Sequence, residues 1–204
     1  MPVIAVTGPR QSGKSTLIRH LLPKYANSNL VGVSYKTINK WISVLETSFI
    51  VYTLGPYHKN YNKRIVKSSK LYFYDTGLAC ALLNLRNTED VNRHFAKGAL
   101  FENFIINEII KNQLNRNIIS KNYFWNAAGA HEIDLLLDQG PKLVPIEIKS
   151  SRTIHSDFFK GLDYFQPISG ALPQNSYLVY GGDQTQSRSI AKVIGWENLS
   201  EIPL

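Results

Sequence analysis

The order of apolar and polar positions predicts a first half that mixes helices with short strands. A β-type apolar run at residues 3–6 leads through a glycine-containing loop into a helical pattern at residues 17–22. Apolar side chains recur at helical spacing over residues 38–45, and residues 49–54 and 70–74 are typical of a strand pair. We therefore expect helical segments followed by a β-hairpin.

The second half predicts one long helix followed by a group of strands. From Gly98 onward, apolar residues such as Leu100, Ile105, Ile109 and Leu114 form a stripe at helical spacing. The later elements are expected as strands at residues 123–126, 131–137 and 143–149, a helix at 158–165 and a strand at 176–180. These patterns indicate an α/β fold of the α+β kind.

Composition then excludes several classes of protein. The 204 residues include one cysteine, Cys80, which rules out a disulfide framework. No apolar run approaches the roughly 20 residues that span a bilayer, and the start of the chain lacks the features of a signal peptide. We expect a cytoplasmic protein without a membrane partner.

The net charge of +8 is distributed unevenly along the chain. Residues 1–25 hold four basic and no acidic residues, residues 26–97 hold ten and four, and residues 98–204 hold nine and eleven. A basic front half is typical of a protein that binds a polyanion, so we expect DNA as a partner. A basic surface that is only solvated explains the same charge pattern.

The glycine-containing loop fits the phosphate-binding pattern G-x-x-x-x-G-K-[ST], and it lies between a predicted strand and a predicted helix. Gly8 and Gly13 allow backbone N–H groups to surround phosphates, and Lys14 is placed to reach the outer phosphates. Ser15 is a candidate Mg²⁺ ligand, and Thr16 completes the motif. The sequence thus indicates a candidate ATP site.

Hydrolysis of ATP needs a second carboxylate at a neighbouring strand end and, in most such enzymes, an arginine. Only a few residues separate Pro23 from Leu30, too few to build the sheet that carries those groups. Asp75 follows the apolar run at residues 71–74, but a strand that ends in a turn explains it better. We do not expect ATP hydrolysis.

The segment after Ser34 has the pattern of a DNA-recognition helix, with apolar residues on one face and polar, basic residues on the other. Lys36 and Lys40 lie on the polar face. The loop between the two predicted strands adds a basic wing that contains Lys59, Lys63, Arg64 and Lys67. A small helical and hairpin domain that only packs against its neighbours explains these residues equally well.

Carboxylates gather in the predicted strands of the second half. Because side chains alternate along a strand, Glu132 and Asp134 share one face, as do Glu147 and Lys149. Asp134 and Glu147 are predicted to hold Mg²⁺, with Lys149 stabilising negative charge during phosphodiester cleavage and Glu102 completing the site from the long helix. Surface strands with outward polar residues explain the alternation without chemistry.

These motifs occur in an order that resembles prokaryotic AAA-type P-loop ATPases. The resemblance rests on Gly8–Thr16, Gly32–Thr37, Lys70–Leu78, Gly98–Asn103, Glu132–Asp134 and Ile146–Ser151. In that family a P-loop domain precedes a winged helix and a C-terminal domain similar to the PD-(D/E)xK nucleases, whose mixed sheet is like that of restriction endonucleases. The resemblance implies a P-loop remnant at 1–25, a winged helix at 26–97 and a nuclease-like domain at 98–204, with Asp134, Glu147 and Lys149 as the nuclease signature and Glu102 as the helix acid.

The chain departs from that family at the ATPase core, because the acidic strand end, the sensor residues and the arginines are absent. An internal deletion near Tyr25 and Ala26 accounts for this. Three functions follow as hypotheses: a DNA-associated protein with a Mg²⁺-dependent nuclease-like domain, active or inactive; an ATP-binding protein that acts through its P-loop; and a folded remnant of a larger gene. Gln166 is a weaker candidate for a supporting contact.

Overall fold

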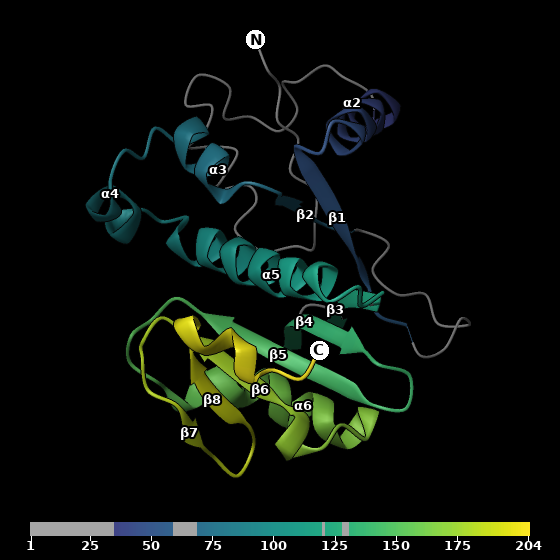
Figure 1. The fold of residues 1–204 in the computed structure, drawn as a ribbon, viewed down its shortest axis with the longest axis vertical. Helices are drawn as coiled ribbons and strands as arrows, with labels where there is room; N and C mark the ends of the chain where they lie inside the picture. The colour runs from purple at the N-terminus through teal and green to yellow at the C-terminus, as the bar shows by residue number, and fades with distance from the viewer. Residues whose placement is uncertain (1–34, 59–68, 120, 128–130) are drawn as a thin grey trace. The chain divides into compact units, whose positions relative to one another are not determined.

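The structure is a computed structural model that describes residues 35–58, 69–119, 121–127 and 131–204 (Figure 1). The chain forms two compact units. The described part of the first comprises residues 35–54 and 69–100, and that of the second comprises Gly55–His58 and the described residues from Phe101 onward.

The first unit is built on the predicted hairpin. Strand β1 (Val51–Pro56) pairs antiparallel with β2 (Lys70–Phe73), from Val51 opposite Phe73 to Leu54 opposite Lys70. The helices of this unit are α2 (Tyr35–Thr47), α3 (Thr76–Leu82), α4 (Thr88–Arg93) and the first turn of α5 (Lys97–Asn115). The predicted strand pair is therefore confirmed.

Helix α2 has the two-sided character that its sequence predicts. Ile42 is buried, and Trp41 and Leu45 are partly buried, whereas Asn39 and Lys40 are exposed. An apolar side turned to the protein and a polar side turned to solvent stabilise a helix of this length through packing.

Asp75 lies between the end of β2 at Phe73 and the start of α3 at Thr76. Its side chain accepts a hydrogen bond from the backbone N–H of Gly77 at 2.7 Å, which makes it the N-cap of that helix. Asp75 thus lies in the short connection between a strand and a helix, in agreement with its interpretation as a residue where a strand ends in a turn.

The second unit contains a mixed sheet in the order β3-β4-β5-β6-β8-β7. Its strands are β3 (Lys121–Ala127), β4 (His131–Asp138), β5 (Leu143–Lys149), β6 (Tyr177–Tyr180), β7 (Gln186–Ser187) and β8 (Lys192–Gly195). Strands β3, β4 and β5 are antiparallel, whereas β5, β6 and β8 run parallel to one another. Gly55 and Pro56 pair in parallel with β3. The predicted α/β class is confirmed.

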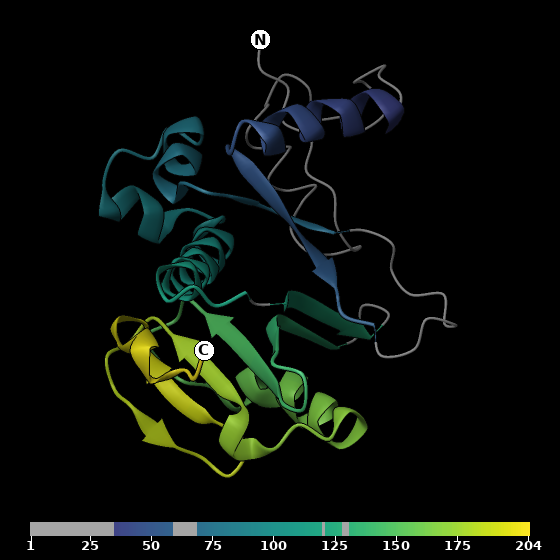
Figure 2. The same ribbon diagram turned by 45° about the vertical axis from the view of Figure 1, so that its right-hand side comes forward.

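Helix α6 (Lys160–Ser169) covers one face of this sheet, and the part of α5 from Phe101 onward lies on the other side of the strands (Figures 1 and 2). Leu162 and Phe165 of α6 pack with Leu178 and Tyr180 of β6 in one hydrophobic cluster. Burial of these side chains fixes which strand residues face α6.

Two details differ from the sequence-based expectations. Leu114, expected in the apolar stripe of the long helix, is 65% exposed in the last turn of α5. Polar Asn103, Asn107 and Gln113 are buried in that helix instead.

Of the helices in the described part of the chain, none is both long and apolar enough to cross a bilayer.

Candidate active site

A β-bulge places Asp134 at the centre of the site. Tyr123 of β3 pairs with Leu136 of β4, but Trp125 pairs with Ile133, so two β4 residues stand opposite one residue of β3. These two residues are Asp134 and Leu135, which stand opposite Phe124. A bulge of this kind interrupts the regular alternation of side chains next to Asp134.

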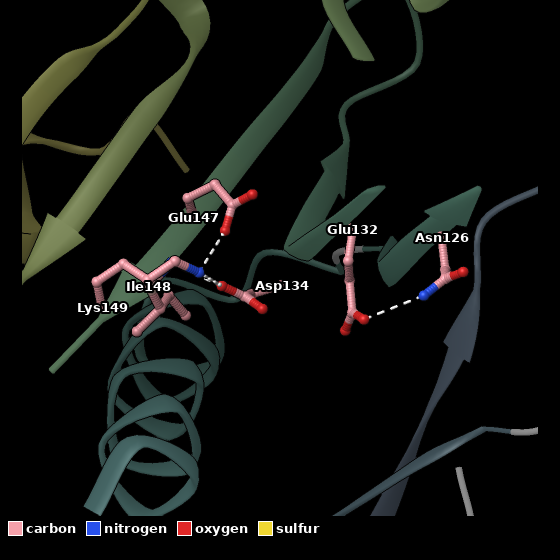
Figure 3. Close-up of polar contacts among 6 residues, drawn as sticks. All are labelled: Asn126, Glu132, Asp134, Glu147, Ile148 and Lys149. Atoms are coloured by element: carbon pink, nitrogen blue, oxygen red, sulfur yellow. Dashed lines mark hydrogen bonds and ion pairs between the residues drawn. The ribbon is translucent and has the colours of Figure 1, made fainter. Parts of the chain in front are cut away.

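The Asp134 carboxylate joins β4 to β5 where their ladder ends. The last pair of that ladder is Leu135 with Ile146. Beyond it, Oδ2 of Asp134 accepts a hydrogen bond from the backbone N–H of Ile148 at 2.8 Å (Figure 3). The side chain thus accepts a hydrogen bond from a buried N–H group that has no partner in the β4–β5 ladder.

Lys149 brings the two predicted carboxylates together. Its Nζ atom lies 3.2 Å from Oδ2 of Asp134 and 2.8 Å from Oε2 of Glu147 (Figure 3). Glu147 pairs with Leu178 and Lys149 with Tyr180, and both partners belong to the cluster under α6. Glu147 and Lys149 therefore lie on the face that α6 covers.

The electrostatics of this group follow from its burial. The side chain of Glu147 is only 5% exposed, that of Asp134 11% and that of Lys149 32%. Burial raises the pKa of the Glu147 carboxyl well above its usual range, and the neighbouring Asp134 raises it further, while Lys149 acts in the opposite direction. Burial lowers the pKa of Lys149, but the two carboxylates outweigh this effect and raise it overall.

Glu132 turns away from the Lys149 cluster. Its Oε2 atom accepts a hydrogen bond from the side-chain amide of Asn126 at 3.0 Å, across the β3–β4 pair (Figure 3). Gln166 also serves another contact: its amide donates to the Ser176 hydroxyl at 2.9 Å and to the Ile190 carbonyl at 2.7 Å. Gln166 thus ties the end of α6 to the segments around β6 and β8.

Glu102, the predicted acid of the long helix, lies near the start of α5. It is partly buried in α5, on the helix that lies across the sheet from α6. Among the described residues, no three His, Cys, Asp or Glu side chains form a group that could hold a metal ion. The ion pairs of the site join Asp134 and Glu147 to Lys149, and Glu102 as a third metal ligand stays a prediction.

The other predicted site residues lie mainly outside the described residues. This holds for the candidate ATP site, which comprises Gly8, Gly13, Lys14, Ser15 and Thr16, and for the candidate wing, which comprises Lys59, Lys63, Arg64 and Lys67. Lys36 lies in the first turn of α2, and Lys40 is exposed on the same helix.

Two groups that hold the carboxylates of the site in place were not predicted from the sequence. The backbone N–H of Ile148 is one, because its role depends on where the β4–β5 ladder ends. The other is Gly161 of α6, which lies against Glu147. A glycine inside a predicted helix is a usable signal, since it lowers helix stability and usually has a packing or functional reason.

Comparison with known families gives two matches. A family model described as a domain of unknown function, DUF4143, matches residues 97–199. A second, also described as a domain of unknown function, DUF8612, matches residues 9–89. The first match covers the Asp134, Glu147 and Lys149 cluster.

Two similar curated proteins come from mycobacteria. They are the uncharacterized proteins Mb2031c of Mycobacterium bovis and Rv2008c of Mycobacterium tuberculosis, each 27% identical over 123 residues. The match covers 59% of this chain and 26% of each relative, so the chain spans about a quarter of the length of the curated relatives it matches.

Proposed function

The chain belongs to the family of the domain of unknown function DUF4143, and we propose that its second unit carries a Mg²⁺-dependent, nuclease-like site that acts on DNA. The observation that carries the proposal is the contact of one lysine Nζ atom with two buried carboxylates from adjacent strands.

Burial of this cluster favours a chemical role. Moving an ion from water into the protein interior costs several kcal/mol. The attraction between two buried ions returns about as much, so a buried ion pair contributes little net stability. Titratable groups with strongly shifted pKa values are concentrated at functional sites. Glu147, with its raised pKa next to Asp134, has this character.

The donor set fits Mg²⁺. This ion prefers oxygen ligands and is commonly held by one or two carboxylates together with waters and substrate phosphates. Asp134 and Glu147 would supply the carboxylates, at the position where their oxygens already converge on a cation. When bound, Mg²⁺ supplies polarisation of the phosphodiester and a more acidic water.

Lys149 has the complementary role in this proposal. Its ammonium neutralises the two carboxylates in the structure described here. With a phosphodiester in the site, the same ammonium would stabilise the negative charge that develops on the phosphate oxygens. Its side chain is 32% exposed, so a substrate can approach it from solvent.

The first unit would supply affinity for DNA, as a winged helix. Helix α2 presents the exposed Lys40 from a helix whose opposite side is packed, and the β1–β2 hairpin follows it in the chain. Lysines on such elements contact phosphates and are expected to give a salt-dependent affinity.

A plasmid-nicking assay tests the proposal. Wild-type protein with Mg²⁺ should nick supercoiled plasmid, and both Asp134→Asn and Glu147→Gln, which keep the side-chain shapes, should abolish nicking. Lys111→Ala, at an exposed position on α5, is the control and should behave as wild type. Equal nicking by the wild type and both site variants would contradict the assignment.

ATP binding at the P-loop is a second candidate function. It rests on the sequence pattern of Gly8, Gly13, Lys14 and Ser15, which is specific for phosphate-binding loops. Titration calorimetry with Mg-ATP tests it: weak binding that Lys14→Ala abolishes supports the candidate, and the same heat signal for both proteins opposes it.

A further inference from the structure

Gly161 lies directly against the carboxylate of Glu147. It is the second residue of α6, and a side-chain Cβ at this position would lie 2.0 Å from Oε1 of Glu147 and 3.2 Å from its Cδ atom. Contacts shorter than about 3.0 Å do not occur between a Cβ atom and a non-bonded heavy atom in proteins. Glu147 can adopt its observed position only because residue 161 has no side chain.

The two oxygens of Glu147 therefore have different neighbours. Oε2 accepts the hydrogen bond from Lys149 at 2.8 Å, and Oε1 lies over the backbone of α6 at Gly161. These two contacts, one at each carboxylate oxygen, restrict its rotation. Preorganised ligand positions of this kind determine how well a carboxylate site binds an ion.

The sequence position is unfavourable for glycine on local grounds. Glycine is among the poorest helix formers, so alanine would be preferred in the first turns of α6 unless tertiary packing opposed it. Gly98, in α5, is different, because a Cβ there would meet nothing within 4 Å. Comparing substitutions at Gly98 and Gly161 therefore separates the general effect of glycine on helix stability from the specific contact of residue 161 with Glu147.

We infer that Gly161 is a positioning residue for Glu147, which holds the carboxylate in the direction that the metal site requires. The metal-binding part of this inference rests on the proposed function, whereas the contact between Gly161 and Glu147 does not. A Cβ at residue 161 would also lie 2.3 Å from the carbonyl oxygen of Glu132, so the experiment must distinguish the carboxylate from the backbone of β4.

A double-mutant cycle makes this distinction. Gly161→Ala should lower the urea midpoint of unfolding, and the loss should be much smaller when the same change is made in the Glu147→Ala background, because the carboxylate is then absent. Equal losses in both backgrounds would overturn the inference, since the Glu132 carbonyl would then account for them. If Gly161→Ala alone does not fold, a folded double variant supports the inference and an unfolded one overturns it.

Mg²⁺ affinity gives the readout that packing alone does not move. Folded Gly161→Ala should bind Mg²⁺ at least about tenfold more weakly than wild type, whereas Gly98→Ala should bind it as wild type does. Adding Glu147→Asp to Gly161→Ala should recover part of the lost affinity, because the shorter side chain withdraws from the new methyl group. Unchanged affinity in Gly161→Ala would overturn the inference. If the wild type binds no Mg²⁺, the proposed function fails, and the urea cycle still decides whether Gly161 positions Glu147.

Discussion

Asp134 on β4 accepts the backbone N–H of Ile148 on β5 at 2.8 Å, immediately beyond the last pair of the strand ladder. The same oxygen, Oδ2, also accepts a hydrogen bond from the Lys149 ammonium. One carboxylate oxygen thus joins the backbone of the sheet to the charged cluster. Changes at Asp134 should therefore affect both the stability of the fold and the site.

Replacement of Asp134 should show these two roles separately. Asp134→Ala leaves the buried N–H of Ile148 without an acceptor and should lower the free energy of unfolding by about 1–3 kcal/mol. Asp134→Asn keeps an oxygen that can accept this hydrogen bond, and it should be less destabilising while still removing the charge. Urea denaturation at neutral pH measures both; equal destabilisation by the two variants would contradict the role assigned to the hydrogen bond.

Glu147 should make stability depend on pH in an unusual direction. Its pKa in the folded protein is raised, so the stability that this group contributes is fully present below its unfolded pKa of about 4.3 and is lost as pH rises through the folded value. Glu147→Gln cannot ionise and lacks this loss.

The difference in the free energy of unfolding between Glu147→Gln and wild type should consequently shift in favour of the variant as pH rises above about 4.3. Urea denaturation of both proteins over a pH series measures this difference and cancels the titration of other carboxyls. A difference that stays constant, or that shifts toward the wild type, would show that Glu147 does not titrate as described.

Lys149 should compete with a divalent cation for Asp134 and Glu147. Lys149→Met removes the ammonium that lies between the two carboxylates and leaves their charges uncompensated. Mg²⁺ should therefore raise the melting temperature of this variant more than that of the wild type.

Lys192→Met provides a matched control for that experiment. Lys192 forms an ion pair with Glu201 at 2.7 Å, in a setting more open to solvent than that of Lys149. Its loss should leave the response of the melting temperature to Mg²⁺ unchanged. An equal response to Mg²⁺ in wild type and Lys149→Met would indicate that the ammonium and the ion do not share a position.

Lys40 should contribute to DNA affinity through the phosphate backbone. Lys40→Ala should weaken binding to duplexes of unrelated sequence by similar factors and reduce the slope of log affinity against log salt by about 0.9. Gel shifts over a range of salt concentrations measure this slope. Lys111→Ala, which removes an exposed lysine from α5, should leave the slope unchanged; the same slope for Lys40→Ala and wild type would argue against contact through α2.

The elements of the fold that depend on local pattern were predictable from the sequence. The two-sided α2, the hairpin strands and the strands that carry Asp134 and Glu147 all follow from the spacing of apolar residues, and the structure confirms them. The pairing of β8 with β6 was not predicted, because it joins segments through contacts that no local periodicity encodes.

The amino-acid sequence by itself determined which groups are available to the site: two carboxylates and a lysine on neighbouring strands, with an apolar background that makes their charges costly to bury. Only the tertiary structure decided their arrangement. The bulge opposite Phe124, the end of the β4–β5 ladder at Ile146 and the approach of Gly161 to Glu147 arise where separate segments meet. Strand register and helix packing set such distances, and a one-residue shift in either would redirect every side chain in the cluster.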